Sequence, residues 1–431
     1  MYQGIKTVSF EEAVKVVKSG DRIHIHSVAC APQGLIQALC NRGRAGELRD
    51  VKLQHLHTEG SAPYAEAEFE GIFFLESYFV GSNVRKPTQE GYADYVPVHL
   101  SETQKLIRSG IHPVDVAMIQ VCPPDKHGFV SMGTSVDATL AAVQNAKTVI
   151  AVINPNVPRA WGDAIIRLSD IDIFCEDNTP LIEAHPATLT EQDIAIGKNV
   201  ASLIEDGATL QMGIGAIPNA VLSQLGNHKN LGIHTEMFAD GVLPLYEKGV
   251  VNNMNKKFDK GKIVSTFLMG SKRVYDFIDD NPGVAMMDVG YTNDPFIIAQ
   301  QPKMTAINSA LSVDITGQVN ADSLGIKFYS GSGGQLDFIR GAAASEGGKP
   351  IIALPAVTNK GVSKICPTLL NGAGVVTTRF DVHYIVTEFG IADLYGKTLQ
   401  ERAKTLINIA HPDHRETLDK AAFERFGSHY H

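Results

Sequence analysis

An internal repeat constrains the fold of this chain more than any other feature of its sequence. The stretch GDRIHIHSVACAPQGLIQAL at 20–39 aligns with GATLQMGIGAIPNAVLSQL at 207–225, and in both a strand, a small-residue loop and an apolar helix follow one another. Four further pairs of similar stretches occur in the same order: 53–60 with 231–238, 125–131 with 314–320, 146–159 with 348–361, and 169–177 with 380–388. Five matches in one order indicate a duplicated unit.

Both halves alternate short apolar runs with helical stretches. Runs such as VAMIQV at 116–121 and TVIAVI at 148–153 are about as long as ordinary strands and rich in β-branched residues. Such runs, separated by helices, are typical of parallel strands that are buried on both faces. We therefore predict an α/β fold with two related open-sheet domains, 1–185 and 190–431, and an active site at their interface. In open α/β sheets, ligands bind at the carboxyl ends of the strands.

The composition excludes several classes of function. The chain has 431 residues, enough for two or three domains, and its 44% hydrophobic content is typical of a globular protein. A net charge of −9 without any basic cluster argues against nucleic-acid binding. The N-terminus lacks the pattern of a signal peptide, and no apolar run is long enough to span a membrane. Five scattered cysteines without a CxxC pair predict reduced thiols and a cytoplasmic location.

Two glycine-dense stretches occur only in the second half. MGIGAIPNA at 212–220 resembles a dinucleotide fingerprint, but Pro218 stands where that motif needs its third glycine, which disfavours a nicotinamide site. Glycines after a strand nevertheless let backbone N–H groups approach a negatively charged ligand. YSGSGGQLDF at 329–338 can supply another such N–H to a developing oxyanion. A ligand-free turn and a flexible surface loop remain the plainer alternatives for these two stretches.

Glu236 ends a short predicted strand about twenty residues after the first glycine loop. A carboxylate in this position can act as a base, a nucleophile, a metal ligand or an ion-pair partner. No HxxxH motif or paired aspartates accompany it, which disfavours a metal. The triplet His57-Thr58-Glu59 repeats His-Thr-Glu in the first half. Glu59 therefore stays an alternative reactive acid, although the loop before it is poorer in glycine.

Several motifs of the chain resemble those of the acetyl-CoA hydrolase/transferase family of coenzyme A transferases. The resemblance covers almost the whole chain, and its motifs are FVGSNVR (79–85), DYVPVHLSE (94–102), QVCPPDKHGFVSMG (120–133), QMGIGAIPNAV (211–221), HTEMFADGV (234–242), GSGGQLDF (331–338) and the long stretch at 381–415. Together they are specific for the family and only weakly specific for the acyl substrate. The fold that this resemblance implies is CoA-transferase-like, of the NagB/RpiA type.

The resemblance also implies roles for individual residues. Glu236 matches the nucleophilic glutamate of the family. The positions that match CoA-contacting residues are Gly213, Ile214, Gly215, Ala216, Ile217, Leu311 and Gly334. Candidates for the oxyanion hole are Ile214, Gly333 and Gly334, and candidates for an acyl or auxiliary carboxylate site are Glu388 and Asn308. A structural ion pair is an equal alternative for Glu388, and either Arg85 or Lys360 could neutralise a substrate carboxylate.

The activity implied by the resemblance is CoA transfer between acyl-CoA and small carboxylates. It would proceed by ping-pong through an acyl-glutamyl anhydride and a glutamyl-CoA thioester, with coenzyme A as substrate and covalent intermediate and with no metal or permanently bound cofactor. We expect 4-hydroxybutyrate with acetate as partner, in fermentation and acetyl-CoA metabolism, then butyrate, with propionate and succinate open. Acetyl-CoA hydrolysis and a silent CoA-binding regulator are the alternatives. A homodimer or homotetramer is the expected assembly.

Overall fold

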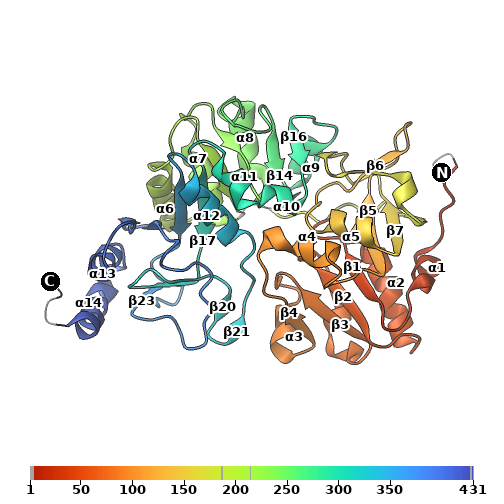
Figure 1. Ribbon diagram of the computed structural model, residues 1–431, viewed down its shortest axis with the longest axis horizontal. Coiled ribbons are helices and arrows are strands. Elements are labelled where there is room, and N and C mark those ends of the chain that lie inside the picture. The colour runs from red at the N-terminus through yellow and green to blue at the C-terminus, as the bar shows by residue number, and fades with distance from the viewer. Residues whose placement is uncertain (1–3, 186–187, 214, 428–429, 431) are drawn as a thin grey trace. The chain divides into compact units, whose positions relative to one another are not determined.

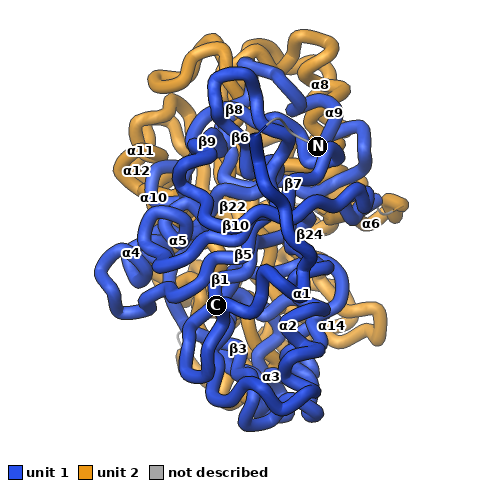
Figure 2. Tube along the Cα trace, turned by 90° about the vertical axis from the view of Figure 1, so that its right-hand side faces the viewer, with its two compact units in different colours: residues 1–185, 264–292, 328–331 blue, residues 186–263, 293–327, 332–431 orange. Residues whose placement is uncertain are grey.

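The computed structural model describes residues 4–185, 188–213, 215–427 and 430. Its chain packs into two compact units, which Figure 2 shows in different colours. Unit 1 contains residues 1–185, 264–292 and 328–331, and unit 2 contains residues 186–263, 293–327 and 332–431. Two later segments of the chain thus pack with the first 185 residues. The division into domains 1–185 and 190–431 stays a prediction.

Unit 1 is built on a parallel sheet (Figure 1). In sheet order, its strands are β10 (Ile173–Glu176), β7 (Thr148–Ile153), β5 (Val116–Val121), β1 (Arg22–Ile25), β2 (Val51–His55), β3 (Phe73–Ser77) and β4 (Ala93–Tyr95). Its helices are α1 (Phe10–Ala13), α2 (Gln33–Arg44), α3 (Arg85–Glu90), α4 (Leu100–Arg108), α5 (Thr139–Asn145), α9 (Lys272–Ile278) and α10 (Val289–Thr292). Every residue of β5 is buried, including the polar Gln120, as expected for a parallel strand covered on both faces.

Unit 2 contains a second open sheet, parallel except for its last strand. In sheet order, its strands are β12 (Gly232–Ile233), β11 (Thr209–Met212), β17 (Thr305–Ser309), β22 (Lys349–Ala353), β24 (Tyr384–Thr387) and the antiparallel β25 (Gly390–Asp393). Its helices are α6 (Glu191–Ala201), α7 (Ala216–Gln224), α8 (Leu243–Glu247), α11 (Pro295–Ala299), α12 (Gln335–Ala344), α13 (Leu399–Asn408) and α14 (Pro412–Phe426). Helix α12 packs on β17 and β22, and α6 packs against α7 and β24.

The remaining strands are short. They are β6 (Phe129–Ser131), β8 (Trp161–Gly162), β9 (Ile165–Arg167), β13 (Met237–Phe238), β14 (Ile263–Ser265), β15 (Phe267–Leu268), β16 (Val284–Met286), β18 (Ser312–Asp314), β19 (Val319–Asn320), β20 (Ser323–Leu324), β21 (Lys327–Phe328) and β23 (Ile365–Cys366). Strand β6 pairs with β9 in unit 1, and β18 pairs with β19 and β23 in unit 2.

The two sheets share one topology. In unit 1, β1 lies between β2 and β5, and in unit 2, β11 lies between β12 and β17. The order β2-β1-β5-β7-β10 therefore matches β12-β11-β17-β22-β24, while β3 and β4 extend the unit 1 sheet beyond β2 and β25 extends the unit 2 sheet beyond β24. Four of these five strand pairs lie in or overlap the repeated stretches of the sequence, whereas β5 and β17 lie between them. The predicted fold class, two related open α/β sheets, is confirmed.

The repeat extends to single hydrogen bonds. In unit 1, Asp125 N–H donates to the carbonyl of Phe129, and the Asp125 carboxylate accepts from the N–H groups of His127 and Phe129. In unit 2, Asp314 makes the same three bonds with Gln318 and Thr316. An aspartate that bonds its own turn fixes the loop locally. The D-x-x-G pattern therefore forms the same hydrogen-bonded turn in both units, at Asp125 and at Asp314.

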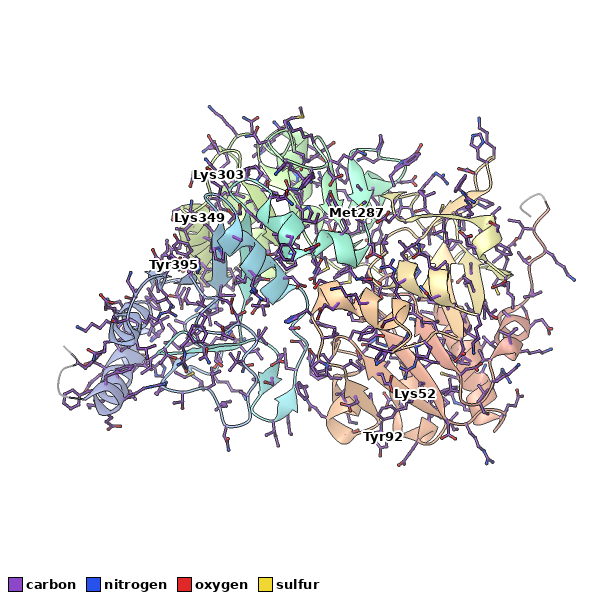
Figure 3. All side chains as sticks on the ribbon, in the orientation of Figure 1. Lys52, Tyr92, Met287, Lys303, Lys349 and Tyr395 are labelled. Carbon is purple, nitrogen blue, oxygen red and sulfur yellow. The ribbon has the colours of Figure 1, made fainter. Side chains whose placement is uncertain are left out.

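The two ends of the unit 2 strands carry different chemistry. At the amino ends, Glu205 accepts from Lys303 Nζ at 2.8 Å and from Lys349 Nζ at 2.5 Å, and Figure 3 labels both lysines. Such exposed ion pairs contribute little to stability. At the carboxyl ends, Gly213 and Gly215 follow β11, Glu236 follows β12, and Asn308 is the penultimate residue of β17. The carboxyl ends are therefore where a site can form.

Candidate active site

Hydrogen bonds at the carboxyl ends of two neighbouring strands bring Glu236 beside the first glycine loop. His234 N–H donates to the carbonyl of Leu210 at 3.1 Å, which continues the ladder between β12 and β11. The Thr235 hydroxyl lies 3.0 Å from the Met212 carbonyl oxygen and accepts from Met212 N–H at 3.2 Å. Thr235, directly before Glu236, is thus hydrogen-bonded to Met212, directly before Gly213. This arrangement explains why the acid follows the loop by about twenty residues.

Two segments distant in the sequence supply hydrogen bonds to the Glu236 carboxylate. Asn293 Nδ2 donates to Glu236 Oε2 at 2.9 Å, and the backbone amide of Gly334 bonds the same carboxylate. Gly334 is the N-cap of α12, and the N-terminus of a helix favours negative charge. A β-carbon at residue 334 would overlap Glu236 Oε2 and Asn293 Nδ2. Only glycine lets the backbone approach the acid this closely.

The surroundings of Glu236 raise the pKa of its carboxyl group to about 7. Desolvation by the protein is the main cause, and the negative charge of Asp337 on α12 adds to it. The hydrogen bonds from Asn293 and Gly334 oppose this rise, because they stabilise the ionised form. Glu236 still keeps partial exposure. The site thus holds an accessible, destabilised carboxylate, which is the state that a nucleophile needs near neutral pH.

The loop between β11 and α7 leaves its backbone open. Gly215 is the N-cap of α7 with φ +123°, a conformation that residues with a side chain rarely adopt. A β-carbon on Gly213 or Gly215 would meet no atom within 4 Å, so space lies beside both. Pro218 lies in the first turn of α7, where its missing N–H costs nothing, as the sequence predicts. The predicted contact Ile214 lies outside the described residues.

A pocket of about 350 Å³ opens beside this loop. It is lined by Asp193, Gly213, Gly215, Ala216, Ile217, Pro218, Ile307, Asn308, Ser309 and Pro355. Asn308 is held by a reciprocal amide contact with Gln211, whose Oε1 accepts from Asn308 Nδ2 at 3.0 Å. The structure thus brings together Asn308 and the four described residues of the predicted CoA loop.

The other predicted site residues of unit 2 lie outside the lining of this pocket. Leu311 N–H donates to the carbonyl of Asn320, and Gly333 adopts φ +52° directly before Gly334. The Glu388 carboxylate accepts from Gln192 Nε2 at 2.5 Å and from Ala356 N–H at 2.9 Å. Glu388 therefore anchors the backbone one residue after Pro355, which does line the pocket.

The alternative candidates have other surroundings. Within the described parts of the chain, no group donates a hydrogen bond to the Glu59 carboxylate, and burial alone raises its pKa. Arg85 Nε donates to the Tyr329 carbonyl at 2.6 Å, and its guanidinium stacks on the Tyr329 ring. Lys360 is exposed. Of the two His-Thr-Glu acids, Glu236 is therefore the one whose carboxylate is bonded by donors from other segments.

Sequence reasoning missed two residues of this site. Asn293 and Asp337 are buried, and neither is among the candidates that the sequence indicates. Asp337 stands in the quoted motif GSGGQLDF, three residues after Gly334, so its place in the first turn of a helix was the available signal. Nothing near Asn293 in the sequence indicates that it reaches Glu236.

The described residues contain no group of three or more His, Cys, Asp or Glu side chains placed to hold a metal ion. In the same part of the chain, helices long and apolar enough to cross a bilayer are absent.

Comparisons with known proteins agree with the resemblance seen in the motifs. Residues 2–183 match the acetyl-CoA hydrolase/transferase N-terminal domain, and residues 270–422 match the acetyl-CoA hydrolase/transferase C-terminal domain. A protein of Fasciola hepatica named succinyl-CoA:acetate/propanoyl-CoA:succinate CoA transferase is 52% identical over 418 residues, 96% of this chain and 87% of that protein. The 4-hydroxybutyrate coenzyme A transferase of Clostridium kluyveri is 47% identical over 422 residues, 98% of each chain.

A solved structure extends the match to the fold. The crystal structure of a 4-hydroxybutyrate CoA-transferase from Porphyromonas gingivalis superposes with a TM-score of 0.84 at 36% identity, covering 98% of both chains. This agreement confirms the CoA-transferase-like fold. The chain therefore belongs to the acetyl-CoA hydrolase/transferase family, and it is a CoA-transferase.

Proposed function

We propose that this enzyme transfers CoA from an acyl-CoA to a free carboxylate through covalent intermediates on Glu236, with 4-hydroxybutyrate as its preferred acyl acid and acetate as partner. The observation that carries the proposal is the Glu236 carboxylate, which is desolvated yet bonded by Asn293 and by the Gly334 amide. The 47% identity to a 4-hydroxybutyrate coenzyme A transferase supports the choice of acid.

The first half-reaction loads CoA onto Glu236. A Glu236 oxygen attacks the thioester carbonyl, the C–S bond breaks, and CoA leaves as a thiolate while an acyl-glutamyl anhydride forms. The thiolate then attacks the glutamyl carbonyl of the anhydride, which releases the first carboxylate and leaves a γ-glutamyl-CoA thioester. An acceptor carboxylate reverses these steps and departs as the new acyl-CoA. The thioester energy is retained, because water takes no part in either step.

Two groups already bonded to Glu236 are placed for this chemistry. When the thiolate attacks the glutamyl carbonyl, negative charge develops on an oxygen of Glu236. Asn293 Nδ2 and the Gly334 amide are bonded to that carboxylate, so both can stabilise the oxyanion. One such donor lowers a barrier by about 3 kcal/mol. For the oxyanion on the acyl carbonyl, Ile214 and Gly333 remain the proposed donors.

The pocket beside the glycine loop is our proposed binding site for CoA. Gly213, Gly215, Ala216 and Ile217 line it, with open space at both glycines. We extend the CoA contacts to Ile214, Leu311 and Gly334. Asn308 and Glu388 are the proposed acyl or auxiliary carboxylate site. Asn308 lines the pocket, and the Glu388 carboxylate accepts a hydrogen bond from Ala356 N–H, next to the pocket residue Pro355.

A second assignment of the acyl acid has its own support. The relative from Fasciola hepatica, whose name specifies succinate, acetate and propanoate, is 52% identical to this chain. Succinate and propionate are therefore the alternative to 4-hydroxybutyrate, and butyrate is a third. A comparison of kcat/KM for the four acyl-CoA esters, with acetate as common acceptor, decides among them. Release of free thiol without acceptor would indicate hydrolysis instead.

The decisive experiment traps the covalent intermediate. The protein is incubated with acetyl-CoA or butyryl-CoA without an acceptor, digested, and searched by mass spectrometry for a CoA adduct. We expect the adduct on the peptide that contains Glu236 and expect none in Glu236→Gln. An adduct on the Glu59 peptide would refute the mechanism. Binding of CoA without any acyl exchange would instead indicate a silent regulator.

We also propose a cytoplasmic location, a role in fermentation, and a homodimeric or homotetrameric assembly. The five cysteines, all within the described residues, are free thiols, which fits a reducing compartment. Sedimentation equilibrium of the purified protein tests the assembly.

A further inference from the structure

A loop of unit 2 borders the strand that leads to Glu236. Strand β12 is the outermost strand of its sheet, with β11 on its inner side. On its outer side, the N–H groups of Asn252 and Asn253 both donate to the carbonyl of Leu231, directly before β12. An edge strand offers unpaired backbone groups, which this loop covers.

Side chains of the same loop bind both backbone groups of Ile233, the last residue of β12. Ile233 N–H donates to Asn253 Oδ1 at 2.8 Å, and the Ile233 carbonyl accepts from Lys256 Nζ at 2.9 Å. His234, the next residue, bonds inward to β11 through Leu210. The chain is thus held from both sides three residues before Glu236.

Lys256 is fully buried. Its Nζ donates a second bond, 2.8 Å long, to the carbonyl of Lys262, and its stem crosses Gly232, where a β-carbon would lie 2.8 Å from Lys256 Cγ. Desolvation lowers the pKa of Lys256 to about 7, against the influence of Asp259. Burying an ammonium group costs free energy that an apolar residue would not cost. The bonds from Lys256 Nζ to the carbonyls of Ile233 and Lys262 offset part of this cost.

We infer that Lys256 and Asn253 are positioning residues for the transfer reaction, which hold Ile233 so that Glu236 meets Asn293 and Gly334. The inference rests on the proposed role of Glu236 as nucleophile. Both residues bond the backbone of Ile233, three residues before Glu236, so we place their action on the backbone of 233–235. A displacement of about 1 Å at a nucleophile can lower a rate by about 100-fold.

The test compares Lys256→Met with Lys257→Met. Methionine keeps the length of the buried stem and removes the donors, whereas the neighbouring Lys257 is exposed and bonds Gln300. The rate of CoA-adduct formation on Glu236 is measured by rapid quench and mass spectrometry, together with the KM for acetyl-CoA. We expect Lys256→Met to slow adduct formation about 30-fold per folded molecule with KM changed less than about threefold. Lys257→Met should match the wild type.

A second pair of variants covers the case in which Lys256→Met does not fold. Asn253 has φ +59° and the exposed Asp50 of unit 1 has φ +53°, so glycine fits both backbones. Asn253→Gly removes the acceptor for Ile233 N–H, and we expect about tenfold slower adduct formation, whereas Asp50→Gly should react normally.

Two outcomes overturn the inference. One is a wild-type rate of adduct formation in folded Lys256→Met or in Asn253→Gly, even if the melting temperature falls. The other is a rise in KM that accounts for the whole loss. If the wild-type protein forms no adduct on Glu236, the proposed function is refuted as well. The wild-type measurement therefore distinguishes a failure of the proposed function from a failure of this inference alone.

Discussion

The first and second copies of His-Thr-Glu differ in what surrounds the acid. Both copies follow the strand next to the first strand of their sheet, β2 in unit 1 and β12 in unit 2. Glu59 N–H donates to Val28 and its carbonyl accepts from Gln33, so its backbone is fixed while its carboxylate has no donor within the described residues. Glu236 has two donors, from Asn293 and from Gly334.

The difference shows how a duplicated fold acquires one site. The repeated strands place an acid at the same topological position twice, yet the donors come from elements outside the matched stretches. Gly334 belongs to the glycine-dense stretch that only the second half contains. Position in the fold is thus necessary for the proposed chemistry, and the surrounding donors distinguish one copy from the other.

The largest expected effect separates the two acids. Glu236→Gln should lower kcat about 10⁴-fold, since an amide cannot form the anhydride, whereas Glu59→Gln should stay within about threefold of the wild type. Steady-state transfer of CoA from butyryl-CoA to acetate measures both. Equal losses in the two variants would show that the copies share the reaction.

The next effect tests the close approach at Gly334. Gly334→Ala places a β-carbon on Glu236 Oε2 and Asn293 Nδ2, and we expect about a 100-fold loss of kcat from the displaced carboxylate. Gly226→Ala is the matched control, because a β-carbon there meets no atom within 4 Å. Wild-type activity in Gly334→Ala would mean that the loop adapts freely.

A smaller effect concerns stability. The pKa of Glu236 is raised from 4.5 to about 7 in the folded protein. Between about pH 4.5 and pH 7, the folded protein therefore keeps a proton that the unfolded chain has lost. Because the unfolded state binds fewer protons in this range, the free energy of unfolding falls as the pH rises. Glu236→Gln should therefore stabilise the protein by about 2 kcal/mol at pH 8 and leave it unchanged near pH 4. Urea unfolding at both pH values checks this. Glu59→Gln should act in the same direction but more weakly, because Glu59 is partly exposed.

The smallest effect is a shift in pH dependence. Activity should fall as pH drops through about 7, because protonated Glu236 cannot attack. Asp337→Asn removes a negative charge that raises the pKa of Glu236, and the acidic limb of kcat/KM should move down by about half a unit to one unit. If the acidic limb of Asp337→Asn does not move, it reports the titration of a group other than Glu236. The same profile for Glu59→Gln serves as the control.

The sequence predicted much of the fold because its signals are local and repeated. Strand-length apolar runs identified β5 and β7, and the ordered matches anticipated a shared strand topology. The alignment of 20–39 with 207–225 does not extend to the exact start of the helix. Pro32 is the N-cap of α2, whereas Pro218 is the third residue of α7.

By itself, the sequence determined the family, the α/β fold and the place of Glu236 at a strand end beside a glycine loop. Only the tertiary structure decided which groups meet that carboxylate. Asn293 lies 57 residues away along the chain, and Lys256 stands in NKKFDKGK, a charged stretch typical of an exposed loop. Hydrogen-bond partners and desolvation depend on contacts between distant segments, and no local pattern encodes them.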